Sequence, residues 1–207
     1  MNRIREHIEK TALNTFHKQN GLSEFQEGFS QQFAEQCELL VTLAVNAQNV
    51  MEIGFNGGHS ADIFLFGNKN MSLVSFDIGE HDYVKTGKEF IDNTYPDRHT
   101  LILGNSLTTI PDYIKGNNGI KFDLIFIDGG HDYDTAKGDI NNCRELAHPD
   151  TVVIMDDTVG DPDGVRHWNV GPNKAWDEAK NCGMIEEFGS MDFRAGRGHS
   201  WGIYNHA

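Results

Sequence analysis

The sequence has little cysteine and few basic side chains. Its 3 Cys, at positions 37, 143 and 182, are widely spaced and odd in number. They form neither a disulfide framework nor a zinc-ligand pattern, so we expect reduced thiols in a cytoplasmic protein. The 17 Lys and Arg are outnumbered by 31 Asp and Glu, for a formal net charge of −14. This balance predicts that neither a nucleic-acid backbone nor an anionic membrane is a partner.

A long apolar run is also missing from the sequence. The first 18 residues, MNRIREHIEKTALNTFHK, are charged throughout, which predicts neither a secretory signal nor a membrane anchor. We expect residues 1–34 to form an N-terminal helical extension or lid, and residues 35–207 to form the main domain. An amphipathic helix over 4–18 could cover a site or pack against a second subunit, giving a homo-oligomer.

Short apolar runs alternate with amphipathic segments from residue 25 onward. Strands are predicted at 50–53, 72–76, 100–103, 122–127 and 152–157. Helices are predicted at 25–47, 60–66, 83–93, 107–115, 134–146 and 172–181. Residues 158–171 have the irregular composition of a loop over a site, and 184–188 with 199–205 resemble an antiparallel pair. The alternation predicts an α/β fold with a mostly parallel sheet and helices on both faces.

Two of the predicted strands end in acidic residues. The stretch FDLIFIDGGHDY ends its apolar run at Asp128 and continues to His131, and VVIMDD ends in Asp156 and Asp157. Ligands bind at the carboxyl ends of parallel strands, so these side chains are expected at one rim. Crowded carboxylates repel each other unless a cation or protons intervene. The alternative is structural: the aspartates cap helices and the Gly pair only turns the chain.

A glycine-rich turn follows the first predicted strand. In NVMEIGFNGGHS, the glycines at 54, 57 and 58 allow close backbone approach to a ligand, although such turns also serve packing alone. Asp77 ends the second strand about 20 residues later, where an acid can accept hydrogen bonds from both ribose hydroxyls of a nucleoside. After the third strand, Ser106 could cap the next helix or face an adenine ring.

This order of signals over residues 35–205 resembles the class I S-adenosylmethionine-dependent methyltransferases. The resemblance implies a Rossmann-like seven-stranded sheet, mostly parallel, with an antiparallel C-terminal hairpin. It also implies that glycines of the turn approach the methionine part of the cofactor, and that Glu52 helps to hold its ammonium group. The cofactor-binding residues implied are Glu52, Gly54, Phe55, Asn56, Gly57, Gly58, Ser60, Asp77, Asn105, Ser106 and Asp128.

Within that class, the two acidic strand ends resemble the metal-dependent O-methyltransferases of the macrolide-sugar and catechol types. The resemblance implies that Asp128, Asp156 and Asp157 bind Mg²⁺, or Mn²⁺ or Ca²⁺ in its place. A catechol-type enzyme has Asp-Asn as the second element and a Lys three residues after the first Asp. Here His131 takes that position, so it is the expected base, with Asp132 and His167 as alternatives.

The expected activity is therefore Mg²⁺-dependent methylation of a hydroxyl on a small molecule, such as a sugar, a polyketide or a catechol-like diol. A hard cation lowers the pKa of a bound hydroxyl, and a neutral imidazole can then accept its proton. Two alternatives stay open: a metal-independent methyltransferase, and a subunit that binds the cofactor without catalysis.

Overall fold

A computed structural model of the chain describes residues 2–22, 29–116, 118–159, 167–194 and 196–205. Its core is a seven-stranded sheet with the order β3-β2-β1-β4-β5-β7-β6. The strands are β1 (Asn49–Ile53), β2 (Ser72–Asp77), β3 (His99–Leu103), β4 (Phe122–Ile127), β5 (Ala147–Met155), β6 (Ile185–Arg194) and β7 (Arg197–Tyr204). The first five pair in parallel, whereas β7 runs antiparallel to both β5 and β6. The predicted Rossmann-like sheet of seven strands, mostly parallel with an antiparallel C-terminal hairpin, is confirmed.

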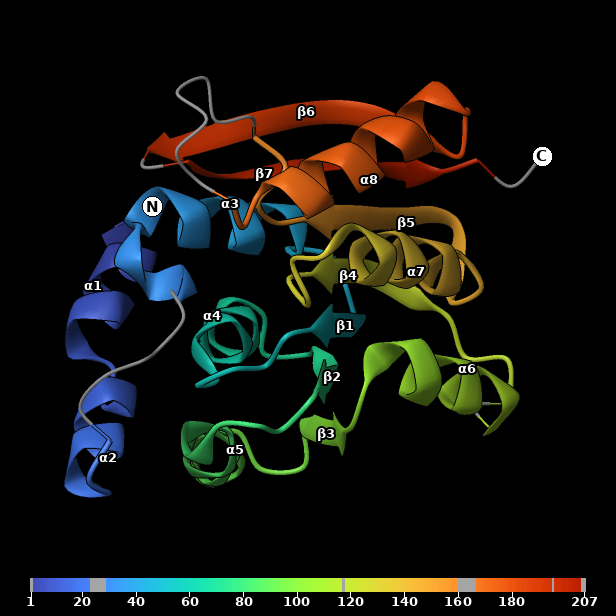
Figure 1. The fold of residues 1–207 in the computed structure, drawn as a ribbon. Helices are drawn as coiled ribbons and strands as arrows, with labels where there is room; N and C mark the ends of the chain where they lie inside the picture. The colour runs from blue at the N-terminus through green and yellow to red at the C-terminus, as the bar shows by residue number, and fades with distance from the viewer. Residues whose placement is uncertain (1, 23–28, 117, 160–166, 195, 206–207) are drawn as a thin grey trace.

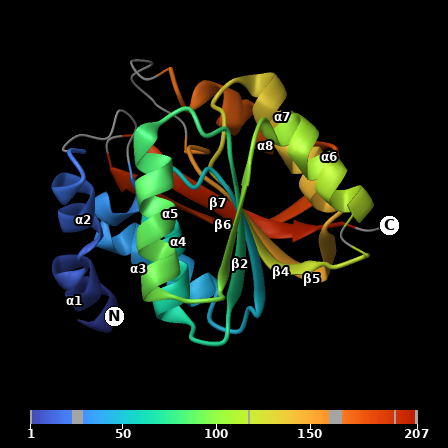
Figure 2. The same cartoon turned by 90° about the horizontal axis from the view of Figure 1, so that it is seen from below.

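Helices cover both faces of this sheet (Figures 1 and 2). One face carries α3 (Ala34–Leu43), α4 (His59–Gly67) and α5 (Asp82–Thr94), and α1 (Asn2–Lys10) and α2 (Leu13–Gln19) pack outside α3 and α5. The other carries α6 (Ser106–Gly116), α7 (Tyr133–Arg144) and α8 (Val170–Asn181). None of the helices in the described ranges combines the length and apolar character needed to cross a membrane.

The central strands are apolar because both of their faces are covered. In β4 every residue except Asp123 is buried, and β1 is buried from Val50 onward. Ile53 pairs with Ile127, so the two strands end at the same level. The chain segments that follow them therefore emerge side by side at one edge of the sheet, as expected for parallel strands.

Two predicted helices differ from the structure. The helix predicted over 25–47 begins only at Ala34, because Phe33 is extended and a short 3-10 helix, Ser30–Gln32, precedes it. Residues 23–28 of that prediction lie outside the described residues. The helix predicted over 4–18 is two helices, since the chain turns at Thr11, whose hydroxyl donates to the carboxylate of Asp62 at 3.1 Å.

The C-terminal hairpin is longer than predicted. Residues 189–194, expected in the connection, belong to β6, which pairs with β7 from Ile185 to Arg194. Strand β5 also starts early, at Ala147, although Pro149 was expected to precede the strand. Its pairing with β4 shifts register after Phe122, and the Thr151 hydroxyl donates to the Phe122 carbonyl at 2.6 Å. This irregularity accommodates the proline, which has no N–H to donate.

One buried carboxylate joins the N-terminal helices to the rest of the fold. Asp62 on α4 is fully buried and lies 2.9 Å from His7 Nε2. It also accepts from Thr11, from Gln31 at 2.8 Å and from Tyr95 at 2.6 Å. Burial acts to raise the pKa of Asp62, but these partners, His7 foremost, outweigh it and the pKa is lowered. The ionised carboxylate on α4 thus links the N-terminal helices, the short 3-10 helix and the residue that follows α5 by hydrogen bonds.

Candidate active site

A cavity of about 370 Å³ opens at the carboxyl ends of the parallel strands. Seven of the predicted site residues line it: Gly54, Asn56, Asp77, Asn105, Ser106, Asp128 and His131. Ile78 and Arg197 line it too, and sequence reasoning did not single them out. The other predicted residues, Glu52, Phe55, Gly57, Gly58, Ser60, Asp156 and Asp157, lie around this cavity without forming its wall.

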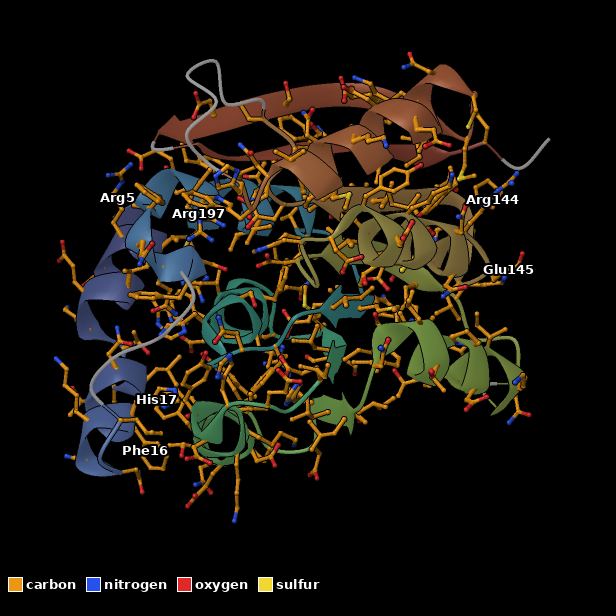
Figure 3. All side chains as sticks on the ribbon, in the orientation of Figure 1. Arg5, Phe16, His17, Arg144, Glu145 and Arg197 are labelled. Carbon is orange, nitrogen blue, oxygen red and sulfur yellow. The ribbon has the colours of Figure 1, made fainter. Side chains whose placement is uncertain are left out.

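The turn after β1 approaches the loop after β4 too closely for a side chain. Gly54 has φ +92°, and a Cβ at this position would lie 1.8 Å from the carbonyl oxygen of Asp128. Only glycine fits both the conformation and the space. Further along the turn, the imidazole of His17 on α2 lies with Nε2 2.9 Å from the carbonyl oxygen of Gly57. Figure 3 labels His17 on this N-terminal helix.

Asp77 is held at the cavity wall by backbone amides. Its Oδ2 accepts from the N–H of Asn56 at 2.8 Å, and its Oδ1 accepts from the N–H of Gly79 at 2.7 Å. A carboxylate oxygen has a second lone pair, so both oxygens can still accept from a ligand. The backbone therefore fixes the carboxylate without using up its acceptor capacity.

Glu52 lies beneath the cavity. It is fully buried and accepts from the hydroxyls of Ser60 at 2.8 Å and Ser75 at 2.6 Å. Burial raises its pKa to about 7, although the two hydroxyls act in the opposite direction. Phe55 is also buried and stacks on His99, with ring centroids 5.0 Å apart. This layer supports the glycine turn from below.

The three aspartates at the ends of β4 and β5 form a crowded acid cluster, defined as Asp128, Asp156 and Asp157. Ile127 pairs with Met155, so the residues that follow both strands are neighbours. Burial, and then the charges of the other two, raise the pKa of Asp128. Burial and the charge of Asp156 raise the pKa of Asp157 to about 8. Asp157 also has φ 55°, a left-handed conformation that side chains adopt at a cost.

Two cationic or potentially cationic side chains from β7 face this cluster. The His199 Nδ1 lies 2.8 Å from Asp156 Oδ1, and the Arg197 Nη2 lies 3.7 Å from Asp156 Oδ2. Burial acts to raise the pKa of Asp156, but His199 and Arg197 outweigh it and lower the pKa. Sequence reasoning did not single out His199 or Arg197. The signal that could have found them is the antiparallel direction of β7, which returns the first residues of that strand to the carboxyl end of β5.

His131 faces the cavity from the loop after β4. Its Nε2 lies 3.2 Å from Asp157 Oδ2, and 41% of its side chain is exposed. Asp132, and not His131, caps α7, because Asp132 Oδ1 accepts from the N–H of Thr135 at 2.9 Å. The first turn of α8 packs against this loop, since a Cβ at Gly171 would lie 2.2 Å from the His131 carbonyl oxygen.

The acid cluster offers oxygen donors suited to a hard divalent cation, and Asp157 Oδ1 is buried without a hydrogen-bond partner among the described residues. Within those residues, however, no three His, Cys, Asp or Glu side chains are arranged to hold a metal ion together. The donor chemistry fits the predicted metal, while Asp156 lies within ion-pair distance of His199 and Arg197 of β7, although neither of its buried oxygens has a hydrogen bond of good geometry among the described residues. Part of the predicted loop over the site, residues 160–166, lies outside the described residues.

Three solved structures illustrate the similarity of the fold. The O-methyltransferase TomG of Streptomyces achromogenes, involved in tomaymycin synthesis and solved with SAM, is 19% identical, with a TM-score of 0.73 over 97% of this chain and 90% of that one. An O-methyltransferase of Bacillus cereus in complex with SAH is 17% identical, with a TM-score of 0.70 and coverages of 98% and 91%. The SAH-bound Podospora anserina methyltransferase PaMTH1 is 18% identical, with a TM-score of 0.69 and coverages of 99% and 94%.

The TM-scores of these structures establish a shared fold with this chain. No curated protein matches the sequence significantly. Residues 51–158 match Methyltransf_24, a methyltransferase domain family, and this match spans more than half of the chain, from β1 to the residues that follow β5. It therefore contains the glycine turn, Asp77 and the whole acid cluster, and the chain belongs to this family of methyltransferases.

Proposed function

We propose that the protein is an S-adenosylmethionine-dependent O-methyltransferase that acts on a hydroxyl of a small molecule. The observation that carries this proposal is the arrangement of one cavity, in which Asp77 and the glycine turn line one part and His131 with the acid cluster borders another. S-adenosylmethionine supplies an electrophilic methyl group on its sulfonium. The O-methyltransferases of similar fold that were solved with SAM or SAH support this choice.

We assign the nucleoside part of the cofactor to Asp77, Asn105 and Ser106. The free lone pairs of Asp77 suit the ribose hydroxyls, and Ile78, which is 56% exposed, adds an apolar surface beside them. For the ammonium group we favour Asp128 over Glu52, because Asp128 lines the cavity and both oxygens of Glu52 accept from serines. The glycine turn would take the methionine part.

His131 is the proposed general base. Its Nε2 lies 3.2 Å from Asp157 Oδ2, a contact that orients the ring. His131 removes the hydroxyl proton while the hydroxyl oxygen bonds to the methyl carbon and the carbon–sulfur bond breaks. The products are a methyl ether and S-adenosylhomocysteine, and the proton leaves the imidazole to solvent. Holding the oxygen, methyl carbon and sulfur in line is a positioning task for the cavity.

We further propose that Mg²⁺ supports this reaction, with Mn²⁺ or Ca²⁺ as substitutes. Asp128, Asp156 and Asp157 would hold the cation, since their carboxylates lie together at the ends of β4 and β5. When bound, such an ion lowers the pKa of the acceptor hydroxyl. A chelating acceptor, such as a diol of a sugar, polyketide or catechol, suits this arrangement. A cytoplasmic location and self-association through the N-terminal helices stay predictions.

Asp77→Ala is the test of the cofactor assignment. It removes the proposed acceptor of two ribose hydroxyls, and hydrogen bonds to charged groups are each worth roughly 1.5–3 kcal/mol. We expect S-adenosylmethionine to bind at least about tenfold more weakly by titration calorimetry. The matched control is Asp112→Ala on α6, an exposed carboxylate that lies 2.8 Å from Lys115 Nζ. Equal affinity of the wild type and Asp77→Ala would exclude the assignment.

Methyl transfer itself is tested with labelled cofactor and a panel of hydroxyl acceptors, with and without EDTA. Turnover that persists in EDTA would favour the metal-independent alternative. Cofactor binding without turnover on any acceptor would favour a catalytically silent subunit.

A further inference from the structure

We propose that Arg197 is a resident cation of the acid cluster, which competes with a divalent cation for Asp156 and keeps the affinity of the site for that cation low. This inference rests on the proposed function in one respect, the divalent cation. It concerns a residue of β7 that lies outside the segment matched by the methyltransferase family.

The position of Arg197 makes it the natural counter-ion. Its Nη2 lies 3.7 Å from Asp156 Oδ2, and it lines the same cavity as Asp128 and His131. A guanidinium stays protonated in proteins, so it supplies one fixed positive charge.

One positive charge does not balance the cluster. When all three carboxylates are ionised they carry three negative charges, and the guanidinium of Arg197, which lies beside Asp156, supplies one positive charge. A divalent cation would supply two more and so replace the protons that crowded carboxylates otherwise need. It also needs carboxylate oxygens directed at one point, and Asp156 is at present directed toward β7.

Of the two partners of Asp156, Arg197 is the one that can move. His199 is fully buried, its Nδ1 lies 2.8 Å from Asp156 Oδ1, and its ring contacts the rings of Phe126 and Phe193. The side chain of Arg197 is 19% exposed toward the cavity, and its Nε has no hydrogen-bond partner among the described residues. Releasing Oδ2 therefore costs one long ion pair, whereas releasing Oδ1 would disturb the core.

The test is equilibrium binding of Mn²⁺ alone, followed by the electron paramagnetic resonance signal of the free ion after EDTA treatment of the protein. We expect Arg197→Gln to bind Mn²⁺ at least about tenfold more tightly than the wild type, because an adjacent positive charge is removed. Arg197→Lys, which keeps the charge, should stay within about threefold of the wild type. Arg197→Met retains the apolar stem and is the second neutral variant.

Arg144→Gln is the matched control for the loss of one positive charge. Arg144 donates to the Asn205 carbonyl at 2.6 Å, and Figure 3 labels it at the opposite end of the view from Arg197. The Arg144→Gln variant should bind Mn²⁺ with the same affinity as the wild type. Equal affinity of the wild type and both neutral variants would overturn the proposal, and so would an absence of Mn²⁺ binding in every protein. Calorimetric titration of the same samples with S-adenosylmethionine shows separately whether the cofactor assignment holds.

Discussion

Two parts of the molecule bury carboxylates, with opposite results. Under the N-terminal helices, Asp62 is surrounded by His7, Thr11, Gln31 and Tyr95, and its pKa is lowered. In the acid cluster at the sheet edge, the nearest groups include other carboxylates, and the pKa of two of the three is raised. Both regions are well buried, so burial alone does not decide the direction.

The direction of the pKa shift depends on how many hydrogen-bond donors surround the buried carboxylate. A carboxylate that receives several hydrogen bonds stays ionised and stabilises the fold, whereas one that meets like charges is costly unless a cation or proton arrives. The first arrangement is structural. The second carries a cost in stability, and such a cost is commonly found where a protein binds a ligand or performs chemistry.

The largest effect on stability is expected at Asp62. Asp62→Ala leaves His7, Gln31 and Tyr95 without their shared acceptor, and removing one partner of a buried charged network costs roughly 3–5 kcal/mol. Urea denaturation should show a loss of this size in the free energy of unfolding. Asp92→Ala, whose side chain is 51% exposed beside Lys88, serves as the control and should lose less than about 0.5 kcal/mol. If Asp62→Ala loses as little free energy of unfolding as Asp92→Ala, the buried carboxylate of Asp62 does not stabilise the fold, and the proposed difference between the two regions is wrong.

The next effect is on catalysis, at His131. His131→Gln should lower kcat by at least about a hundredfold, because a general base contributes roughly 10² to 10⁴ in rate, while cofactor affinity and thermal stability stay near wild type. His148→Gln is a close control. His148 Nε2 lies 3.2 Å from Asp123 Oδ1, the same separation as in the His131–Asp157 pair, and is 32% exposed. If both variants keep most of their kcat, the base lies elsewhere, with Asp132 or His167 next to be tested.

The smallest effect expected is a change in the pH dependence of stability at Glu52. Its pKa in the folded protein, about 7, exceeds the ordinary value of 4.5, so the folded state binds the extra proton between these values. Stability therefore falls as the pH rises from 4.5 to 7. Asp62 acts in the opposite sense, because its stabilisation is present above its ordinary pKa and is lost as the pH falls through its lowered one.

In the Glu52→Gln variant, the part of the decline in the free energy of unfolding that Glu52 causes, on the order of 2 kcal/mol, should be absent. Unfolding experiments run at several pH values measure this. The exposed Glu89 provides the control, and Glu89→Gln should leave the slope unchanged. An unaltered slope in Glu52→Gln would mean that the two serine hydroxyls already stabilise the charged form, as the donors around Asp62 do.

The sheet and its functional edge could be predicted because their signals are local. Apolar runs that stop at Asp77, Asp128 or Asp156 identify both a strand and the end of that strand, and parallel pairing then brings these ends together. The contact of Glu52 with the cofactor stays a prediction, and the structure adds that its carboxylate accepts hydrogen bonds from Ser60 and Ser75. The sequence around Glu52 does not show that the hydroxyls of Ser60 and Ser75 lie next to its carboxylate in the fold.

Contacts between distant segments were beyond sequence reasoning. Arg197 and His199 meet Asp156 through the pairing of β7 with β5, and although an antiparallel hairpin was predicted, its register, in which Met155 pairs with Ser200, could not be read from the sequence. The partners of Asp62 come from several separate segments, and the break before Ala34 places Gln31 among them. Each of these partners is an ordinary polar residue in its own segment.

The contact between His17 and the Gly57 carbonyl has a consequence for how the protein responds to ligands. Because one hydrogen bond of 2.9 Å joins α2 to the glycine turn, local opening of that helix and loosening of the turn are linked equilibria. A ligand that orders the turn must protect α2 against opening, and by reciprocity an undocked α2 must weaken the ligand by the same free energy. No described residue of α2 lines the cavity, yet the helix shares in the energetics of whatever binds there.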